Sequence, residues 1–195
     1  DGTQAQQFEL YRRSYVAIKL VFPNAIIGGP SLANYDKGNT TLWLNYCYQN
    51  HLIPGFVAWH ELGNADSNIP GVASDIAYFK GLYHGYPGFT ATKFLITELV
   101  GNTCWLQPGS ILAYLKYCED GGADGSMKGC WNDVTTNTGP TPGQNTCFNG
   151  GLDGLLNASD GGKRAAYWAY RTYADGILNR VATTTDDPNM VALAS

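Results

Sequence analysis

The stretch Lys93-Phe94-Leu95-Ile96-Thr97-Glu98-Leu99 says most about the fold of this 195-residue chain. Its apolar and β-branched residues run directly into a carboxylate. A continuous run of this kind is typical of a strand that is buried on both faces. In parallel α/β barrels the C-terminal ends of the strands carry the active site. We therefore predict a core strand with Glu98 at its functional edge; the alternative is a solvated Glu at the start of a loop.

Patterns typical of helices and strands alternate along the chain. We expect helices over residues 6–21, 41–50, 72–82, 110–119 and 163–181, and strands over residues 25–29, 55–60, 93–98 and 123–131. The expected strands recur at about 30 residues or a little more, the length of a βαβ unit. This alternation indicates an α/β fold with a parallel sheet and crossover helices.

Two parallel architectures fit such an alternation. The chain contains no G-x-G-x-x-G motif and no P-loop, which disfavours a doubly wound nucleotide-binding sheet. A small-molecule enzyme of that type would also need a ligand crevice where the strand order reverses. A (β/α) barrel remains, although a complete one has eight units and about 250 residues, and this chain supplies half that number of units.

Composition limits the possible functions. Hydrophobic residues make up 44% of the chain, enough for a core, and charged residues only 14%. The formal net charge of −4 offers no basic face to a phosphate backbone, so nucleic acid is not an expected partner. No apolar run is long enough to span a membrane. The 13 Tyr and 5 Trp are typical of carbohydrate-active and secreted proteins, and also of aromatic-rich cores.

The cysteines and two glycosylation motifs indicate a secreted, extracellular glycoprotein. None of the five Cys forms a C-x-x-C pair and the three His are scattered, so a structural zinc site is not expected. Cys130 and Cys147 bracket a segment rich in Gly, Thr, Pro and Asn, and a disulfide between them would contribute roughly 3 kcal/mol. Asn39 and Asn157 each begin an N-x-[ST] acceptor motif. An odd number of cysteines leaves one thiol unpaired or joined to another chain.

Several short motifs resemble, in order and spacing, the second half of a clan-A retaining glycoside hydrolase. The similarity is greatest to glycoside hydrolase family 39, the xylosidase and iduronidase group, and suggests a fungal member. The motifs are Phe8-Glu9-Leu10-Tyr11, Ala17-Ile18-Lys19, Phe22-Pro23-Asn24-Ala25, Ile27-Gly28-Gly29-Pro30-Ser31, Phe56-Val57-Ala58-Trp59-His60, Ile96-Thr97-Glu98, Cys130-Trp131, Gly154-Leu155-Leu156 and Ala165-Ala166-Tyr167-Trp168-Ala169-Tyr170.

The resemblance implies a partial (β/α)8 TIM barrel. Residues 1–182 would be the C-terminal half of the catalytic barrel, with its fifth to eighth strands, and residues 183–195 a tail or linker toward an absent domain. The family's acid/base Glu lies in an Asn-Glu-Pro motif on the fourth strand, and this chain has no Asn-Glu pair. The expected partners are thus a carbohydrate substrate and an N-terminal half-barrel, as a second chain or a missing segment; no cofactor or metal is implied.

The resemblance also implies roles for individual residues. Glu98 would be the nucleophile, and His60 would donate a hydrogen bond to it or to a sugar hydroxyl. Leu62 stands where the family often has a tyrosine that supports the nucleophile, which puts that hydrogen bond in doubt. Glu61 is either a second carboxylate near the site or points to the opposite side of its strand.

Aromatic residues complete the expected site. Trp131 resembles the tryptophan that forms the sugar platform of the central subsite, although a core Trp is an alternative. Trp105 and Tyr35 follow strands and would bind outer sugar units, unless they are ordinary loop aromatics.

Half a barrel alone would expose two unpaired strand edges, which proteins generally avoid. The chain is therefore expected to pair with a partner at its first and last strands. The alternative function is a non-catalytic secreted module that closes by self-association and binds carbohydrate through its aromatic residues.

Overall fold

The chain forms a four-stranded parallel sheet with helical crossovers. The computed structural model describes residues 2–62, 69–89, 92–101, 104, 106–129, 154–157, 160–187 and 190–195. Its elements are α1 (Gln4–Val21), β1 (Gly29–Leu32), α2 (Lys37–Gln49), β2 (Phe56–Glu61), α3 (Gly71–His84), β3 (Lys93–Leu99), α4 (Pro108–Gly121), β4 (Gly125–Lys128) and α5 (Ala165–Gly176). The sheet order is β1-β2-β3-β4 and each neighbouring pair is parallel. The predicted α/β class is confirmed.

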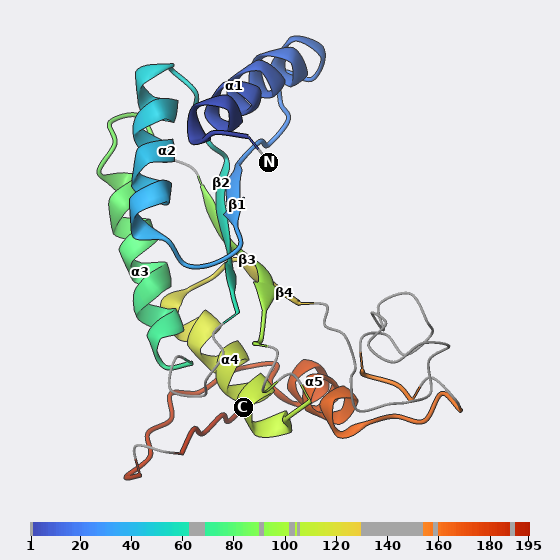
Figure 1. Cartoon of the computed structure of the whole chain (residues 1–195). Coiled ribbons are helices and arrows are strands. Elements are labelled where there is room, and N and C mark those ends of the chain that lie inside the picture. Colours follow the sequence, from blue (N-terminus) through green and yellow to red (C-terminus); the bar gives the residue numbers. More distant parts are fainter. Residues whose placement is uncertain are drawn as a thin grey trace.

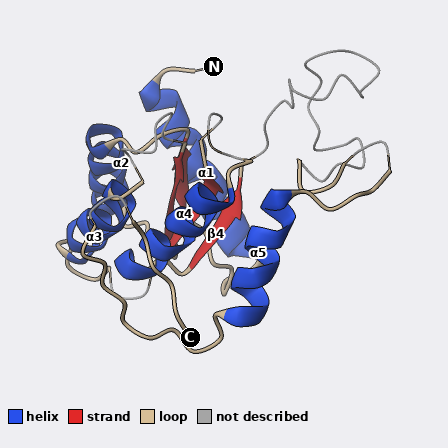
Figure 2. Ribbon diagram, turned by 90° about the horizontal axis from the view of Figure 1, so that it is seen from below, coloured by secondary structure: helices blue, strands red, loops and turns tan. Residues whose placement is uncertain are grey.

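The helices lie on one side of the sheet. Figure 1 shows α2 and α3 side by side along this face, with α1 at the upper end and α5 at the lower end. Figure 2, seen from below, shows α2, α3, α4 and α5 following the strands in an arc. The helix-covered face holds the core, whereas the described helices leave the opposite face of the sheet uncovered.

The core forms where strand and helix side chains meet on the covered face. Its largest fully buried side chains are Trp43, Leu44, Val57, Trp59, Ile76, Phe79, Tyr83, Phe94, Ile96, Leu99, Ile111 and Tyr114. On β3, Phe94 and Ile96 are buried while Leu95 and Thr97 are only half-buried. The prediction that this strand is buried on both faces is therefore wrong within the described residues, because one row faces the uncovered side of the sheet.

The first strand begins later than the sequence pattern predicts. Residues 25–29 were expected to form it, but β1 starts at Gly29, and Ile26 is 68% exposed. Gly28 explains the shift, since a Cβ built there would lie 2.2 Å from the Phe56 carbonyl oxygen. The glycine lets the chain approach β2 closely enough for pairing to begin with Gly29 beside Val57.

The C-terminal segment also differs from expectation. The final helix ends at Gly176 instead of continuing to Val181, and Leu178 is 73% exposed. Glycine is a poor helix former, and the large apolar residues Leu178 and Val181 beyond it are both exposed and offer little burial to offset this. Val181 instead forms an antiparallel bridge with Ala194, so the tail folds back on itself.

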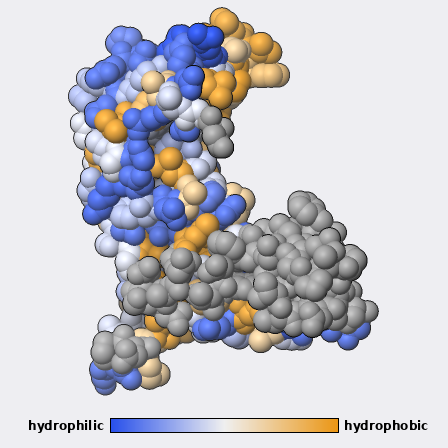
Figure 3. Space-filling view, viewed as in Figure 1, coloured by the Kyte–Doolittle hydropathy of each residue, from blue (hydrophilic) through white to orange (hydrophobic). Residues whose placement is uncertain are grey.

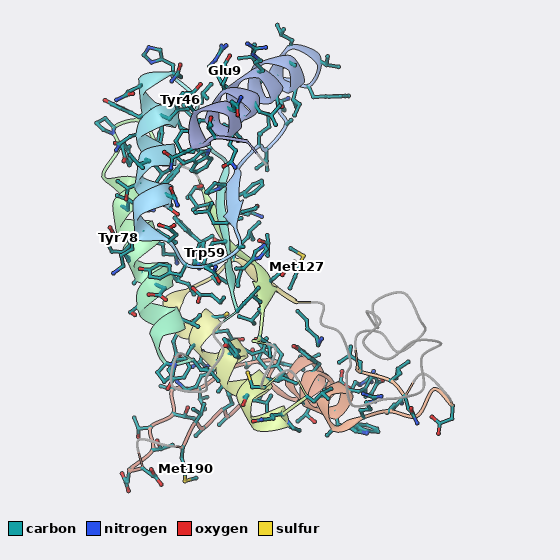
Figure 4. All side chains as sticks on the ribbon, in the orientation of Figure 1. Glu9, Tyr46, Trp59, Tyr78, Met127 and Met190 are labelled. Carbon is teal, nitrogen blue, oxygen red and sulfur yellow. The ribbon has the colours of Figure 1, made fainter. Side chains whose placement is uncertain are left out.

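Helix α1 is well capped but weakly buried. Thr3 and Gln6 form a capping box, which satisfies free amide groups at the helix start. None of its residues is buried. Glu9 joins α1 to α2 by accepting a hydrogen bond from Tyr46 at 3.0 Å (Figure 4), and bonds from Arg12 and Arg13 hold the pKa of this carboxyl far below its ordinary value.

Candidate functional site

A β-bulge at the C-terminal end of β3 turns Glu98 away from the helices. On β2 the adjacent residues Trp59 and His60 pair with Ile96 and Glu98, so Thr97 is one extra residue on β3. The ladder with β4 is irregular at the same place, between Ile96 and Leu99. Bulges are common next to active sites, where they redirect a side chain. Here the bulge keeps Ile96 and Leu99 buried while Glu98 reaches the uncovered face.

Glu98 meets His60 on this uncovered face. The His60 Nδ1 and Glu98 Oε2 atoms are 3.4 Å apart, and the two side chains are 17% and 43% exposed. The structure thus brings together two of the residues singled out from the sequence, at the carboxyl ends of neighbouring strands. An accessible carboxylate beside an imidazole can act as a nucleophile or as a hydrogen-bond acceptor for a ligand hydroxyl.

The backbone after Glu98 is held in an unusual conformation. Val100 has φ of 77°, in the left-handed region that β-branched residues rarely adopt. Thr97 Oγ1 donates to the Trp59 carbonyl oxygen at 3.3 Å, which ties the bulge to β2. Strained residues persist where the surrounding structure holds them, and they cluster at functional sites.

Glu61 points to the other side of the sheet. Its Oε1 accepts a hydrogen bond from Trp59 Nε1 at 2.6 Å, and its side chain lies among the helices with the residue 8% exposed. The pKa of Glu61 is raised to about 7, chiefly by burial and to a smaller extent by Asp75, while the bond from Trp59 opposes the rise. Of the two directions that the sequence left open, the side chain takes the one away from His60 and Glu98, so it does not line their site.

Tyr35 lies in the loop between β1 and α2 and packs on α3. Its ring centroid is 4.9 Å from that of Phe79 and 6.5 Å from that of Tyr78. This places it on the helical side with Glu61 rather than with Glu98. The predicted sugar-binding residues Trp105 and Trp131 lie outside the described residues.

The predicted modification sites receive no support from the structure. Asn39 lies within α2 and donates from Nδ2 to Asp36 at 2.6 Å, unlike an acceptor in a surface loop. Asn157 is described, but the next two residues of its motif are not. The predicted pair Cys130 and Cys147 also lies outside the described residues.

The described thiols are buried. Burial raises the pKa of Cys47 and of Cys118 to about 12, which makes both poor nucleophiles. Cys104 is also buried, and its Sγ donates to the Gly101 carbonyl oxygen at 3.6 Å.

The described part of the chain shows neither a metal-binding cluster nor a membrane-spanning helix. No three His, Cys, Asp or Glu side chains there gather closely enough to hold a metal ion. None of the described helices combines the length and the apolar character needed to cross a membrane.

Sequence reasoning missed the Thr97 bulge and the proximity of Asp75 to Glu61. The bulge has a weak signal, because the large apolar residues Phe94, Ile96 and Leu99 are spaced by two and then three positions. Asp75 carries no signal, since it lies on a helix that only the fold brings against the end of β2.

Comparison with known proteins shows the fold and little more. No protein-family model matches the chain, and no curated protein matches it significantly. The structure of N2152 from Neocallimastix frontalis is similar with a TM-score of 0.66 and 27% identity, over 87% of this chain and 38% of that one. A glucosidase from Croceicoccus marinus gives a TM-score of 0.55 and 22% identity, over 64% of this chain and 28% of the other. The chain thus spans well under half the length of either, and it shares its α/β fold with a glucosidase.

Proposed function

We propose that the chain is the C-terminal half of a (β/α)8 glycosidase barrel that hydrolyses O-glycosidic bonds with retention of configuration. The observation that carries the proposal is the Glu98–His60 pair, with 3.4 Å between Oε2 and Nδ1, at the carboxyl ends of adjacent parallel strands. The shared fold with a glucosidase and the family 39 motifs support the same class. A xylosidase-like substrate is the finer proposal, and it rests on the motifs alone.

In this mechanism Glu98 attacks the anomeric carbon of the sugar and forms a covalent glycosyl ester. The leaving oxygen takes a proton from a second carboxylic acid, which then activates the water that releases the sugar. His60, when its proton is on Nδ1, donates to Glu98 and keeps the attacking oxygen aligned. Trp131 would provide the platform for the sugar ring.

The second carboxyl must come from elsewhere, since Glu61 faces the helices. In retaining enzymes the two carboxyl groups are about 5–5.5 Å apart. We propose that an N-terminal half-barrel, as a second chain or another segment of the same protein, supplies the acid/base Glu. Residues 1–182 would be the complementary half and residues 183–195 a tail or linker. Secretion remains a prediction from the sequence.

The free side of β1 offers a place for that partner. A cavity of about 340 Å³ lies between α1, β1 and α2, with Tyr11, Gly29 and Trp43 in its wall. The Tyr11 hydroxyl and the Trp43 indole N–H are buried without a hydrogen-bond partner among the described residues. A strand paired with β1 would bring backbone carbonyl groups toward these donors, and buried donors are normally satisfied.

Trapping of the nucleophile tests the proposal. A 2-fluoro-xyloside or 2-fluoro-glucoside with a dinitrophenyl leaving group, which departs without protonation, is incubated with the native protein and followed by intact mass spectrometry. We expect an adduct on Glu98 that is absent from Glu98→Gln and retained by Glu119→Gln, which removes a carboxyl group from α4. Carbohydrate binding without any adduct would instead favour the non-catalytic carbohydrate-binding half-barrel.

A further inference from the structure

The last residues of β2 are fastened on the helical side of the sheet. Trp59 Nε1 donates to Glu61 Oε1 at 2.6 Å, and both residues are buried. Trp59 is itself anchored against α3, with its ring centroid 4.7 Å from that of Phe79 (Figure 4). We call this hydrogen-bonded pair the Trp59–Glu61 clamp. The residue between its two members is His60, on the opposite face.

We propose that the Trp59–Glu61 clamp positions the His60 imidazole against Glu98, and that the charge on Glu61 makes this positioning depend on pH. The catalytic consequence of this inference rests on the proposed function of Glu98. The positioning itself is a property of the folded chain and needs no substrate.

The geometry of a strand explains why the clamp acts on His60. Successive side chains of a strand point to opposite faces, so a bond between residues i and i+2 fixes the backbone on both sides of residue i+1. Thr97 Oγ1 also donates to the Trp59 carbonyl oxygen at 3.3 Å. The clamp is therefore connected both to β2 and to the bulge that presents Glu98.

The groups around Glu61 determine how its charge acts. Asp75 faces it from α3, Tyr35 from the loop before α2, and Tyr114 and Cys118 from α4. All four are acidic or neutral groups, and the Lys37 ammonium of α2 acts on Asp75 beside them. Burial first, and then Asp75, raises the pKa of Glu61 to about 7. The bond from Trp59 favours the ionised carboxylate, while burial and Asp75 favour the protonated form. Loss of the proton near neutral pH therefore strengthens the hydrogen bond of the clamp and places a charged Glu61 near Asp75.

The indole N–H of Trp59 is a direct reporter of this proton. In the ¹⁵N-labelled chain, its NMR resonance is assigned with Trp59→Phe and followed between pH 5 and 9, a range of about two units either side of the pKa. We expect an inflection near pH 7 in the unmodified protein and in the control Glu119→Gln. Glu61→Gln should lack the inflection and keep the resonance near its low-pH position, because the amide oxygen still accepts the bond.

Asp75→Asn gives a second test at the same carboxyl group. Removing the neighbouring negative charge should move the Trp59 inflection to lower pH, since ionised Glu61 is then less disfavoured. An inflection that is absent from the unmodified protein, or that persists in Glu61→Gln, overturns the assignment of the proton to Glu61.

The ring resonances of His60 test the coupling. In the unmodified protein they should change along with the Trp59 inflection, and Glu61→Gln should lose this component. Trp59→Phe, which removes the donor, should shift the His60 signals at every pH, whereas the matched control Trp168→Phe, at a residue 51% exposed, should not. The positioning role is overturned if both clamp variants stay folded and leave the His60 signals unchanged.

The test of the Trp59–Glu61 clamp can be distinguished from the test of Glu98 as a nucleophile. If Glu98 is labelled by the fluoro-glycoside, Trp59→Phe should slow labelling by about tenfold, since small misplacements of reacting groups are costly. Coupling in the NMR spectra without any labelling of Glu98 would support the clamp and count against the glycosidase proposal alone.

Discussion

At the scale of single residues, Glu61 makes the stability of the protein depend on pH. Its pKa in the folded chain is raised from the ordinary value of 4.5 to about 7. A carboxyl group with a raised pKa contributes its full stability below pH 4.5, and that contribution is lost as the pH rises through 7. Each pKa unit corresponds to about 1.4 kcal/mol, so the loss between pH 5 and 8 is about 2–3 kcal/mol.

Glu61→Gln should therefore remove this loss. Urea unfolding at pH 5 and pH 8 measures the free energy of unfolding of both proteins, and the variant should gain about 2–3 kcal/mol relative to the unmodified chain at the higher pH. An equal difference between the two proteins at both pH values would show that Glu61 does not titrate in this range.

Gly28 is the residue that sets where β1 begins. A methyl group there would lie 2.2 Å from the Phe56 carbonyl oxygen. Because this oxygen belongs to the backbone of β2, it cannot move away as a flexible side chain could. Gly28→Ala should lower the free energy of unfolding by about 3 kcal/mol. Gly81→Ala in α3 is the control, since nothing lies within 4 Å of its added methyl group. That control should be stabilising by up to about 1 kcal/mol, and a comparable effect of both changes would contradict this account of Gly28.

At the scale of elements, a helix or strand was predicted correctly where the spacing of its apolar residues matches the side chains that the fold buries. Strand β3 was placed correctly because Phe94, Ile96 and Leu99 must all be buried in a segment too short for a helix. The spacing of these three residues is only a weak signal for the bulge at Thr97, because the same residues also fit a regular alternation, and only the ladders to β2 and β4 show the extra residue.

The candidate site was predictable to the same extent. The ends of two neighbouring parallel strands had to meet, and so His60 and Glu98 lie together. The direction of Glu61 was not predictable, because it depends on a hydrogen bond from Trp59 and on space between β2 and α3 that no local pattern reveals.

Helix α1 should be less stable than helix α3. It buries no residue, whereas α3 buries Val72, Ile76, Phe79 and Tyr83. Elements with few buried contacts open at lower free energy. In hydrogen exchange followed by mass spectrometry, peptides from α1 should exchange at least about tenfold faster than those from α3 and β3. Equal protection of all three elements would show that α1 is held by contacts that its exposure does not reveal.

At the scale of the whole molecule, a patch of apolar side chains is left without cover. Figure 3 shows hydrophobic side chains gathered over the C-terminal end of α1. Leu20, Val21, Phe22 and Ile26 in this region are each between 65% and 79% exposed. Exposed apolar patches of this kind are typical of interaction surfaces. Together with the free edges of β1 and β4 in the described sheet, the patch favours association over an isolated monomer.

This exposure predicts that the chain alone associates with itself and that the patch contributes to the contact. Light scattering after size exclusion, at roughly micromolar concentrations, should give a mass above the 21.1 kDa of one chain. Leu20→Lys should shift the population toward monomer, because a desolvated ammonium group would oppose burial of the patch. Leu178→Lys is the matched control, since Leu178 is 73% exposed but lies beyond α5, and it should leave the mass unchanged.

A monomer in all three proteins would mean that neither the sheet edges nor the α1 patch is an interaction surface. If a separately supplied N-terminal half-barrel displaced self-association and raised the protection of α1, the surface would belong to the proposed barrel.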